Sequence, residues 1–348
     1  DSALYRSHHV SEELNLNGFK SYVTISESAH LLDYAGSFKV FIFQKVAYND
    51  KIKNFINKIK SLDKEIIFET DDLIFDARYF ENSDYVKNIN SLEKKQYEKG
   101  GVGEEILKDK YVRTCTASTE YLADKLREYN KKVFVVPNKL SQNDIEVANA
   151  IMKDKEEKIP DTKYQIPNTI RLGYFSGTIS HNKDFAVIAG ALMEVMEKYP
   201  QVELFLVGPL DIESKLNKFS GRIKQLPYVT RKKHFENIAK VDINLAPLEI
   251  GNPFCESRSE LKFFEAGIVG VPTVASATGT FKEAISDGVD GFAVSDTEGW
   301  KNRLEELILS PELRSRMGLE ARKKALEQYS TQTAKNEEYY GFLRSKLN

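Results

Sequence analysis

The sequence is poor in cysteine, with only Cys115 and Cys255 among its 348 residues. Two cysteines exclude a disulfide framework, and their scarcity fits a reducing compartment. The sequence also has no run of about 18 apolar residues, which argues against a membrane-spanning helix. We therefore expect a cytoplasmic protein, and leave open whether it contacts the inner face of a membrane.

An excess of charge of one sign is also lacking. The 50 basic and 52 acidic side chains leave a formal net charge of −2. This balance argues against a nucleic-acid-binding protein, because contact with a phosphate backbone needs a basic excess. The histidines and cysteines show no spacing typical of a metal site, and the sequence has neither a P-loop nor a nucleophile elbow. We therefore expect no required metal and no bound cofactor.

Hydrophobic residues make up 41% of the chain, and its length suits two domains. Apolar runs of strand length alternate with amphipathic stretches of helix length, which predicts parallel sheets covered by helices on both faces. The expected strands are 21–25, 39–43, 65–69, 112–116, 133–136, 170–175, 202–207, 243–245 and 273–275. The expected helices are 5–16, 52–62, 120–129, 140–158, 186–198, 232–239, 260–269, 298–309 and 331–347. Because the alternation occurs twice, we predict an α/β fold with two doubly wound domains.

The same alternation predicts the domain boundaries. We expect a first domain over 1–140, a linker helix and loop over 141–168, a second domain over 169–330 and a terminal helix over 331–348. The first helix should follow a strand, so we expect a strand before Asp1. Further domains of a longer polypeptide are left open.

The segment 252–272 is the strongest candidate for chemistry. Ser259 can cap a helix over 260–269. Arg258 and Lys262 would then lie at the positive end of that helix, an arrangement that makes sense if an anion such as phosphate binds there. Glu265 would lie one turn deeper, where its carboxylate can accept hydrogen bonds from two sugar hydroxyls. The alternative is a solvated turn in which Glu265 pairs with Lys262.

The block SELKFFEAGIVGVPTVAS, residues 259–276, resembles the nucleotide-sugar signature of glycosyltransferase family 4. That family has the GT-B architecture, in which two Rossmann-like domains face a cleft. Four further stretches carry the resemblance, namely 133–138, 172–185, 202–210 and 279–292. The resemblance implies that the second domain binds the nucleotide sugar, and that the terminal helix crosses back to the first domain.

Residue by residue, the resemblance assigns Glu265 to the second glutamate of an E-x7-E motif, which binds the ribose of the nucleotide. The first glutamate of that motif would fall at Ser257, so the neighbouring Glu256 is expected to stand in for it. This departure leaves the identity of the sugar open.

The family also binds the diphosphate through a loop after the first strand of its donor domain. Lys183 matches the basic residue of that loop, whereas Gly177 and Thr178 stand where the family has glycine and arginine. One diphosphate contact is therefore expected to be lost or to come from elsewhere, with Arg258 and Lys262 as candidates. A second loop, Gly279-Thr280-Phe281, is expected to offer backbone N–H groups to the diphosphate or the sugar, with a plain turn as the alternative.

In the first half, Arg6 and the neighbouring His8 and His9 lie where the family has residues facing the cleft. Arg6 is a candidate for contact with a phosphate across the cleft, and His8 or His9 for contact with the acceptor. A surface histidine pair is the alternative. Asp71 and Asp72 follow the expected strand 65–69, at the edge where parallel sheets bind ligands. We expect one of them to activate or orient an acceptor hydroxyl, or else to cap a helix.

Together these features predict a retaining glycosyltransferase that moves a sugar from a nucleotide-diphosphate sugar, linked to UDP, GDP or dTDP, to a glycan or lipid-linked glycan. Synthesis of bacterial surface polysaccharide is the setting that the resemblance suggests. Two alternatives stay open. One is a nucleotide-sugar 2-epimerase, which shares the architecture, and the other is a non-catalytic binding module of a larger assembly protein.

Overall fold

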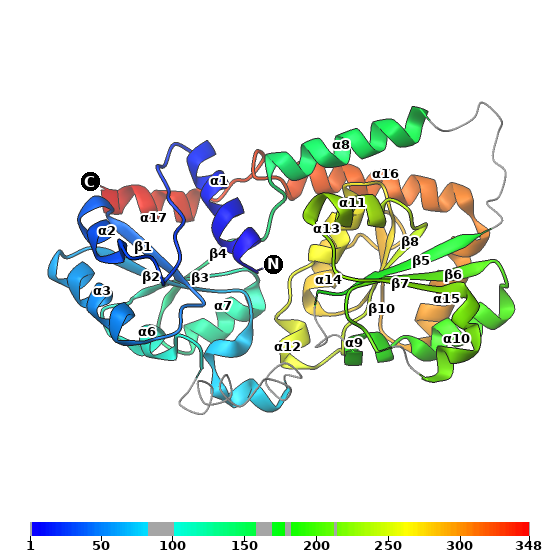
Figure 1. The fold of residues 1–348 in the computed structure, drawn as a ribbon, viewed down its shortest axis with the longest axis horizontal. Coiled ribbons are helices and arrows are strands. Elements are labelled where there is room, and N and C mark those ends of the chain that lie inside the picture. The colour runs from blue at the N-terminus through cyan, green and yellow to red at the C-terminus, as the bar shows by residue number, and fades with distance from the viewer. Residues whose placement is uncertain (1, 83–100, 158–168, 178–181, 212–213, 348) are drawn as a thin grey trace. The chain divides into compact units, whose positions relative to one another are not determined.

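The computed structural model describes residues 2–82, 101–157, 169–177, 182–211 and 214–347. The chain divides into two compact units, which are described separately. Unit 1 contains Asp1–Lys139, Ser257–Ser259 and Ala334–Asn348, and unit 2 contains Leu140–Glu256 and Glu260–Thr333. Figure 1 traces both units along the chain.

Unit 1 is built on a parallel sheet of four strands, in the order β1-β2-β3-β4. The strands are β1 (Val40–Gln44), β2 (Glu65–Thr70), β3 (Thr114–Ala117) and β4 (Lys132–Val135). The helices are η1 (Leu4–His9), α1 (Val10–Leu16), α2 (Leu31–Ser37), α3 (Asp50–Ser61), η2 (Leu73–Phe75), η3 (Ala77–Asn82), α6 (Glu104–Lys108), α7 (Glu120–Arg127) and α17 (Glu337–Leu347). In β2 the side chains Ile66, Ile67 and Phe68 are all buried, as expected of a strand covered on both faces.

The prediction of a strand over 21–25 is wrong. This segment has no strand pairing, and Tyr22 and Ile25 are 60% and 66% exposed. It has the apolar residues of a strand, but no neighbouring strand among the described residues pairs with it.

The predicted terminal helix begins at Glu337 rather than at 331. Its Tyr339, Tyr340 and Leu343 pack with residues of α1, β2 and β4 in one core cluster of unit 1.

Unit 2 contains a parallel sheet of six strands in the order β10-β9-β8-β5-β6-β7. They are β5 (Ile170–Phe175), β6 (Val202–Val207), β7 (Ile223–Leu226), β8 (Ile243–Ala246), β9 (Thr273–Ser276) and β10 (Gly291–Val294). The chain proceeds outward from β5 to β7, then returns to β8 beside β5 and proceeds the other way. This is the strand order of a Rossmann fold, in which ligands bind where the order reverses.

The helices of unit 2 cover this sheet. They are α8 (Gln142–Glu157), α9 (Asn182–Ala186), α10 (Ala189–Lys198), η5 (Ser214–Arg222), α11 (Arg231–Ile238), α12 (Pro253–Glu256), α13 (Leu261–Gly267), α14 (Gly279–Ala284), α15 (Thr297–Leu309) and α16 (Pro311–Gln328). Among the described residues, none of these helices, nor any in unit 1, has the length and apolar character that crossing a bilayer requires. The core includes Tyr174, Phe185 and Trp300, so Trp300 is a packing residue.

The short helix α13 is held by close contact with α16. A side chain on Gly267 would bring its Cβ to 2.8 Å from the Ala321 carbonyl oxygen, and one on Gly318 would come to 2.2 Å from that of Gly270. Glycine at these positions therefore allows the two backbones to approach closely. Because α13 carries Lys262 and Glu265, this contact fixes the helix that the sequence places at the candidate site.

We expect Gly318→Ala to destabilise the protein by about 1–3 kcal/mol, because the added methyl group overpacks the contact between α16 and Gly270. The matched control is Gly341→Ala in α17, where nothing lies within 4 Å of the added Cβ. That substitution should be neutral or stabilise by up to about 1 kcal/mol. Urea unfolding of both variants tests the difference, and equal midpoints for Gly318→Ala and the wild type would contradict the close contact.

Candidate functional site

The carboxyl edge of the unit 2 sheet brings Lys262 to the strand at which the order reverses. The Lys262 Nζ donates to the carbonyl oxygen of Phe175, the last residue of β5. The same ammonium lies 5.1 Å from the centre of the Tyr174 ring. The predicted cation is thus placed at the ligand-binding edge of the sheet.

Glu265 lies on the same helix and is 8% exposed. Its Oε1 accepts a hydrogen bond from Arg231 Nη1, and its Oε2 lies 3.1 Å from His234 Nε2. Both partners come from α11. Sequence reasoning did not connect them with Glu265, although their spacing of three residues places them on one face of a helix.

The predicted cap of α13 is wrong. The N-cap residue of this helix is Glu260, which makes no side-chain capping bond, and the helix ends at Gly267 rather than at 269. Ser259 belongs instead to the short segment Ser257–Ser259 of unit 1, together with Arg258. The Ser259 Oγ accepts a hydrogen bond from Asn138 Nδ2 at 2.8 Å.

Glu256 uses both carboxylate oxygens to accept backbone hydrogen bonds. Oε1 lies 2.9 Å from the nitrogen of Gly251, and Oε2 lies 3.0 Å from the nitrogen of Gly279. The backbone N–H of Gly279 that we expected to face a ligand therefore donates to Glu256. Thr280 is the second residue of α14 and is partly exposed.

Three predicted residues follow β5. Gly177 follows the strand, Thr178 lies outside the described residues, and Lys183 is an exposed residue of α9.

The next residue, Asp184, is buried and accepts a hydrogen bond from the thiol of Cys255 at 3.2 Å. Glu249 lies near this pair, with ligand atoms of all three residues within 4.8 Å of one another. We assign no metal to this group, because the thiol and carboxylate already bond to each other.

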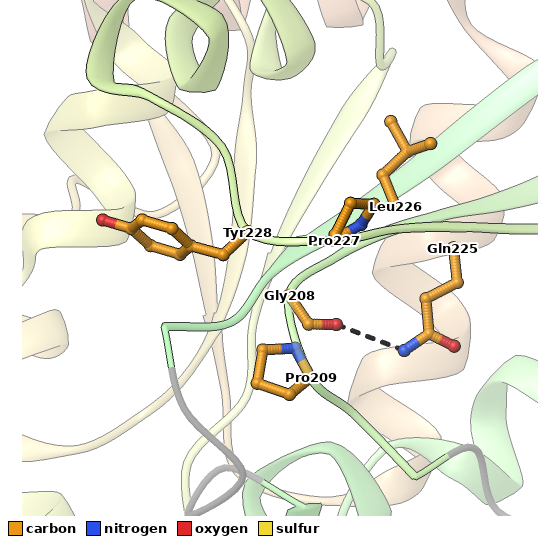
Figure 2. A pocket seen from close by; sticks show the side chains of 6 residues that line it. All are labelled: Gly208, Pro209, Gln225, Leu226, Pro227 and Tyr228. Carbon is orange, nitrogen blue, oxygen red and sulfur yellow. Dashed lines mark hydrogen bonds between the residues drawn. The ribbon is translucent and has the colours of Figure 1, made fainter.

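A cavity of about 460 Å³ opens at the carboxyl ends of β6 and β7. Figure 2 shows its lining residues, Gly208, Pro209, Gln225, Leu226, Pro227 and Tyr228. The Gln225 side-chain nitrogen donates to the carbonyl oxygens of Gly208 and Leu210, at 3.2 and 2.9 Å. Tyr228 is 59% exposed. Its ring and the neighbouring prolines offer flat apolar surface of the kind that accommodates an aromatic base.

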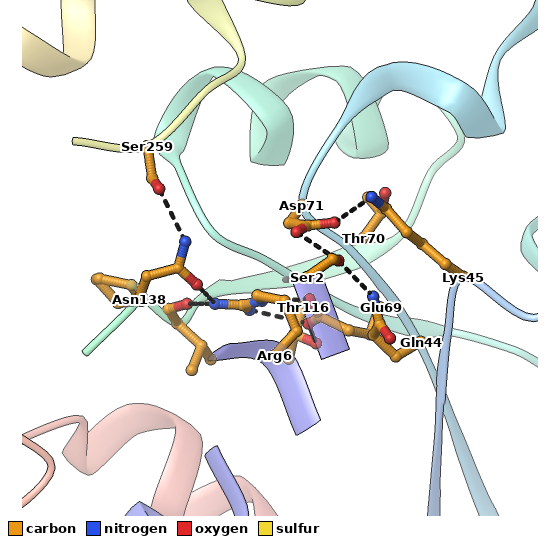
Figure 3. Close-up of polar contacts among 12 residues, drawn as sticks. Ser2, Arg6, Gln44, Lys45, Glu69, Thr70, Asp71, Thr116, Asn138 and Ser259 are labelled. Carbon is orange, nitrogen blue, oxygen red and sulfur yellow. Dashed lines mark hydrogen bonds and ion pairs between the residues drawn. The ribbon is translucent and has the colours of Figure 1, made fainter. Parts of the chain in front are cut away.

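In unit 1, Arg6 is buried in a polar network (Figure 3). Its Nε and Nη2 donate to the two oxygens of Glu69 at 2.7 and 3.1 Å. Its Nη1 donates to the carbonyl oxygen of Val136 at 2.5 Å and to Asn138 Oδ1 at 3.0 Å. Burial raises the pKa of the Glu69 carboxyl. The neighbouring guanidinium of Arg6 opposes this effect, because it stabilises the ionised carboxylate. This geometry favours a structural role for Arg6 over the predicted contact with a phosphate.

His9 is also buried, at 5% exposure. Its Nδ1 lies 2.7 Å from the carbonyl oxygen of Lys139, and its ring meets that of Tyr5 at a centroid distance of 4.9 Å. Packing of this kind favours a structural role for His9 over contact with an acceptor.

Asp71 and Asp72 both pair with a residue that the sequence did not single out, Lys45. Figure 3 shows the contact between Lys45 and Asp71. The Lys45 Nζ lies 2.6 Å from Asp71 Oδ1 and also pairs with Asp72. Although burial opposes ionisation, the neighbouring ammonium holds the pKa of the Asp71 carboxyl below its ordinary value. The Asp72 Oδ1 accepts from the backbone nitrogen of Ile74 at 3.1 Å, which makes Asp72 the cap of η2.

The chain is similar in sequence and in fold to known glycosyltransferases. Residues 171–310 match the family model described as glycosyl transferases group 1. Solved structures with similar folds include HepE of Anabaena in complex with UDP and glucose, with a TM-score of 0.61, 15% identity, and coverage of 91% of this chain and 81% of that one. A glycosyltransferase from Rickettsia africae has a TM-score of 0.58 at 14% identity, covering 97% and 88%. The fold is that of the GT-B glycosyltransferases.

The predicted fold class is thereby confirmed. Sucrose-phosphate synthase from Thermosynechococcus elongatus has the same fold, with a TM-score of 0.55 and 13% identity over 95% of this chain and 80% of that one. In sequence, the chain is similar to spore coat protein SA of Bacillus subtilis, with 26% identity over 169 residues. That match spans 45% of each protein, less than half the length of the curated relative.

We expect Arg6→Met to destabilise the protein by about 3–5 kcal/mol, because it leaves the buried carboxylate of Glu69 without its cation. Arg127→Met is the control, since the ion pairs of Arg127 are on the surface and contribute about 0–1 kcal/mol. Chemical unfolding of the two variants measures the difference. An Arg6→Met protein as stable as the control would return Arg6 to the list of ligand-binding candidates.

Proposed function

We propose that this protein is a retaining glycosyltransferase that transfers a sugar from a nucleotide-diphosphate sugar to a hydroxyl of a glycan or lipid-linked glycan. The observation that carries the proposal is the placement of Lys262 and Glu265, on one helix, at the carboxyl edge of the unit 2 sheet. This edge is where Rossmann-type domains hold nucleotides. The similarity of residues 171–310 to glycosyl transferases group 1 supports the same assignment.

The nucleotide is proposed to extend along this edge. The base would enter the cavity beside Tyr228, the ribose would bond to Glu265, and the diphosphate would meet Lys262 and Lys183. A UDP-sugar is the first donor to test, because structures of the similar HepE contain UDP or UDP-glucose. Catalysis would then consist of positioning the reactants and stabilising the negative charge of the departing diphosphate. With lysines meeting that charge, the scheme requires neither a metal nor a protein nucleophile.

Unit 1 is proposed to present the acceptor. Asp71 follows β2 at the carboxyl edge of its sheet and is held by Lys45. Because its pKa is lowered, Asp71 is a weak base near neutral pH, so its carboxylate would orient an acceptor hydroxyl rather than remove its proton. Synthesis of a bacterial surface glycan, on the cytoplasmic side of the membrane, is the proposed setting.

The proposal is tested by calorimetric titration of the protein with UDP and UDP-glucose, together with GDP- and dTDP-sugars. Incubation of a bound donor with and without glycan acceptors then identifies the reaction. Transfer that requires an acceptor supports the proposal. A donor epimerised without an acceptor would point to an isomerase, and no binding of any nucleotide sugar would point to a protein without this activity.

We expect Lys262→Met to weaken binding of UDP by about tenfold or more, because a hydrogen bond to a charged group contributes about 1.5–3 kcal/mol. Lys153→Met, at an exposed position of α8, removes the same charge and should leave the affinity unchanged. Calorimetry with both variants makes the comparison. Equal affinity for the Lys262→Met variant and the wild type would remove the proposed diphosphate site.

We expect Asp71→Asn to lower the rate of transfer by about tenfold or more while leaving UDP affinity unchanged, because the substitution weakens a charged hydrogen bond to the acceptor. Asp33→Asn in α2, where the side chain is 78% exposed, serves as the control. Initial rates at saturating donor provide the measurement. If Asp71→Asn transfers sugar as fast as Asp33→Asn does, Asp71 has no part in presenting the acceptor.

A further inference from the structure

The helix α11 presents two side chains, three residues apart, to the two oxygens of one carboxylate. Arg231 bonds to Glu265 Oε1, and His234 lies 3.1 Å from Oε2. The His234 ring is itself packed edge-on against Phe175 at the end of β5, with a centroid distance of 5.6 Å. Two residues of one rigid helix thus determine the direction in which the carboxylate of Glu265 points.

Arg231 also forms an ion pair with a second carboxylate, that of Asp144. Its Nε and Nη2 each lie 3.0 Å from an oxygen of Asp144, which is 2% exposed. The guanidinium carbon also lies 4.5 Å from the centre of the Phe235 ring. A guanidinium has five N–H donors in a rigid plane, so it can hold Asp144 and Glu265 at the same time.

Asp144 is itself fixed at the start of α8. Its backbone nitrogen donates to Ser141 Oγ at 3.1 Å, and its Oδ2 accepts from the Ser141 nitrogen at 3.2 Å. This reciprocal pair is a capping box, which orders the first turn of the helix. The helix cap therefore fixes Asp144, Asp144 holds Arg231, and Arg231 in turn holds Glu265.

We propose that Arg231 is a positioning residue, which orients Glu265 so that its carboxylate accepts the hydroxyl groups of a nucleotide's ribose. The inference rests on the proposed function, because it takes Glu265 as the ribose ligand. A carboxylate offers about four acceptor positions, so bonds from Arg231 and His234 are compatible with further bonds from hydroxyls. A glutamate without this support would have to lose rotamer freedom when the nucleotide binds.

This role predicts an effect on ribose recognition in particular. Loss of Arg231 should weaken the bonds from Glu265 to the 2′- and 3′-hydroxyls and leave the contacts of the base and diphosphate in place. A merely structural role, or a general loss of positive charge, would instead weaken binding of a nucleotide with or without these hydroxyls by the same factor.

The experiment compares UDP with 2′,3′-dideoxy-UDP by calorimetry on the full chain. We expect the wild type to prefer UDP by about tenfold or more. Arg231→Met should lose most of this preference, with its affinity for dideoxy-UDP within about twofold of the wild type. Lys233→Met is the matched control, because it removes one positive charge from an exposed position of the same helix, and it should keep the full preference.

Two further variants keep the test decisive. Arg231→Lys retains the charge and is the variant to use if Arg231→Met does not fold, and it should show an intermediate preference. In a Glu265→Gln background, which itself loses the preference for UDP, adding Arg231→Met should change UDP affinity little, because Arg231 acts through Glu265.

The outcomes separate the two hypotheses. The inference is overturned if Arg231→Met keeps the preference for UDP, or weakens both nucleotides equally, while the wild type binds UDP more tightly than dideoxy-UDP. Wild-type protein that binds neither nucleotide, nor any GDP or dTDP compound, would overturn the proposed function and the inference with it. Wild-type protein that binds both UDP compounds equally would leave a nucleotide site but would exclude ribose recognition by Glu265.

Discussion

The common direction of the strands is the constraint on which both candidate sites depend. Each described sheet is entirely parallel. Residues that follow the strands of one sheet therefore gather along a single edge of it. In unit 2 this brings the end of β5, the Tyr228 loop after β7 and the helix α13 to one edge. In unit 1 it brings Lys45 and Asp71, which follow neighbouring strands, within bonding distance. The strand topology thus determines which residues can meet at each edge.

Two arginines, the buried Arg6 and the partly exposed Arg231, illustrate how such an edge is supported. Arg6 and Arg231 each hold carboxylates, and burying a charge is tolerated only when it is paired. The bonds of Arg6 are to a carboxylate and to two groups of the segment that follows β4, all buried in unit 1. Those of Arg231 join the buried carboxylate of Asp144 to that of Glu265, which the resemblance assigns to the ribose of a nucleotide. The same pairing therefore stabilises the fold in one case and, in the other, orients the carboxylate that we propose to bind a ribose.

The sequence was sufficient to predict most strands and the α/β fold, because these depend on local patterns, whereas the roles of Lys262 and Glu265, which rest on one motif, stay predictions. It was insufficient for β7, in which Lys224 and Gln225 are polar, and for β10, which begins with a glycine. The 18-residue helix α16 was also missed, since its surface is largely polar and exposed. Arg231 and Asp144 could not be connected with Glu265, because the three lie far apart in the chain and meet only through the packing of α8, α11 and α13.

The departure from the family motif at Ser257 has a structural counterpart. Ser257 is fully buried, and its carbonyl oxygen accepts a hydrogen bond from Thr119 Oγ1 at 3.2 Å, so a carboxylate at this position would need a partner in the interior. Glu256 instead joins the turn at Gly251 to the start of α14 through two backbone hydrogen bonds. Its carboxylate therefore organises the loop that would face the sugar. Any selectivity for the sugar would then depend on the shape of this loop as well as on direct contact with Glu256.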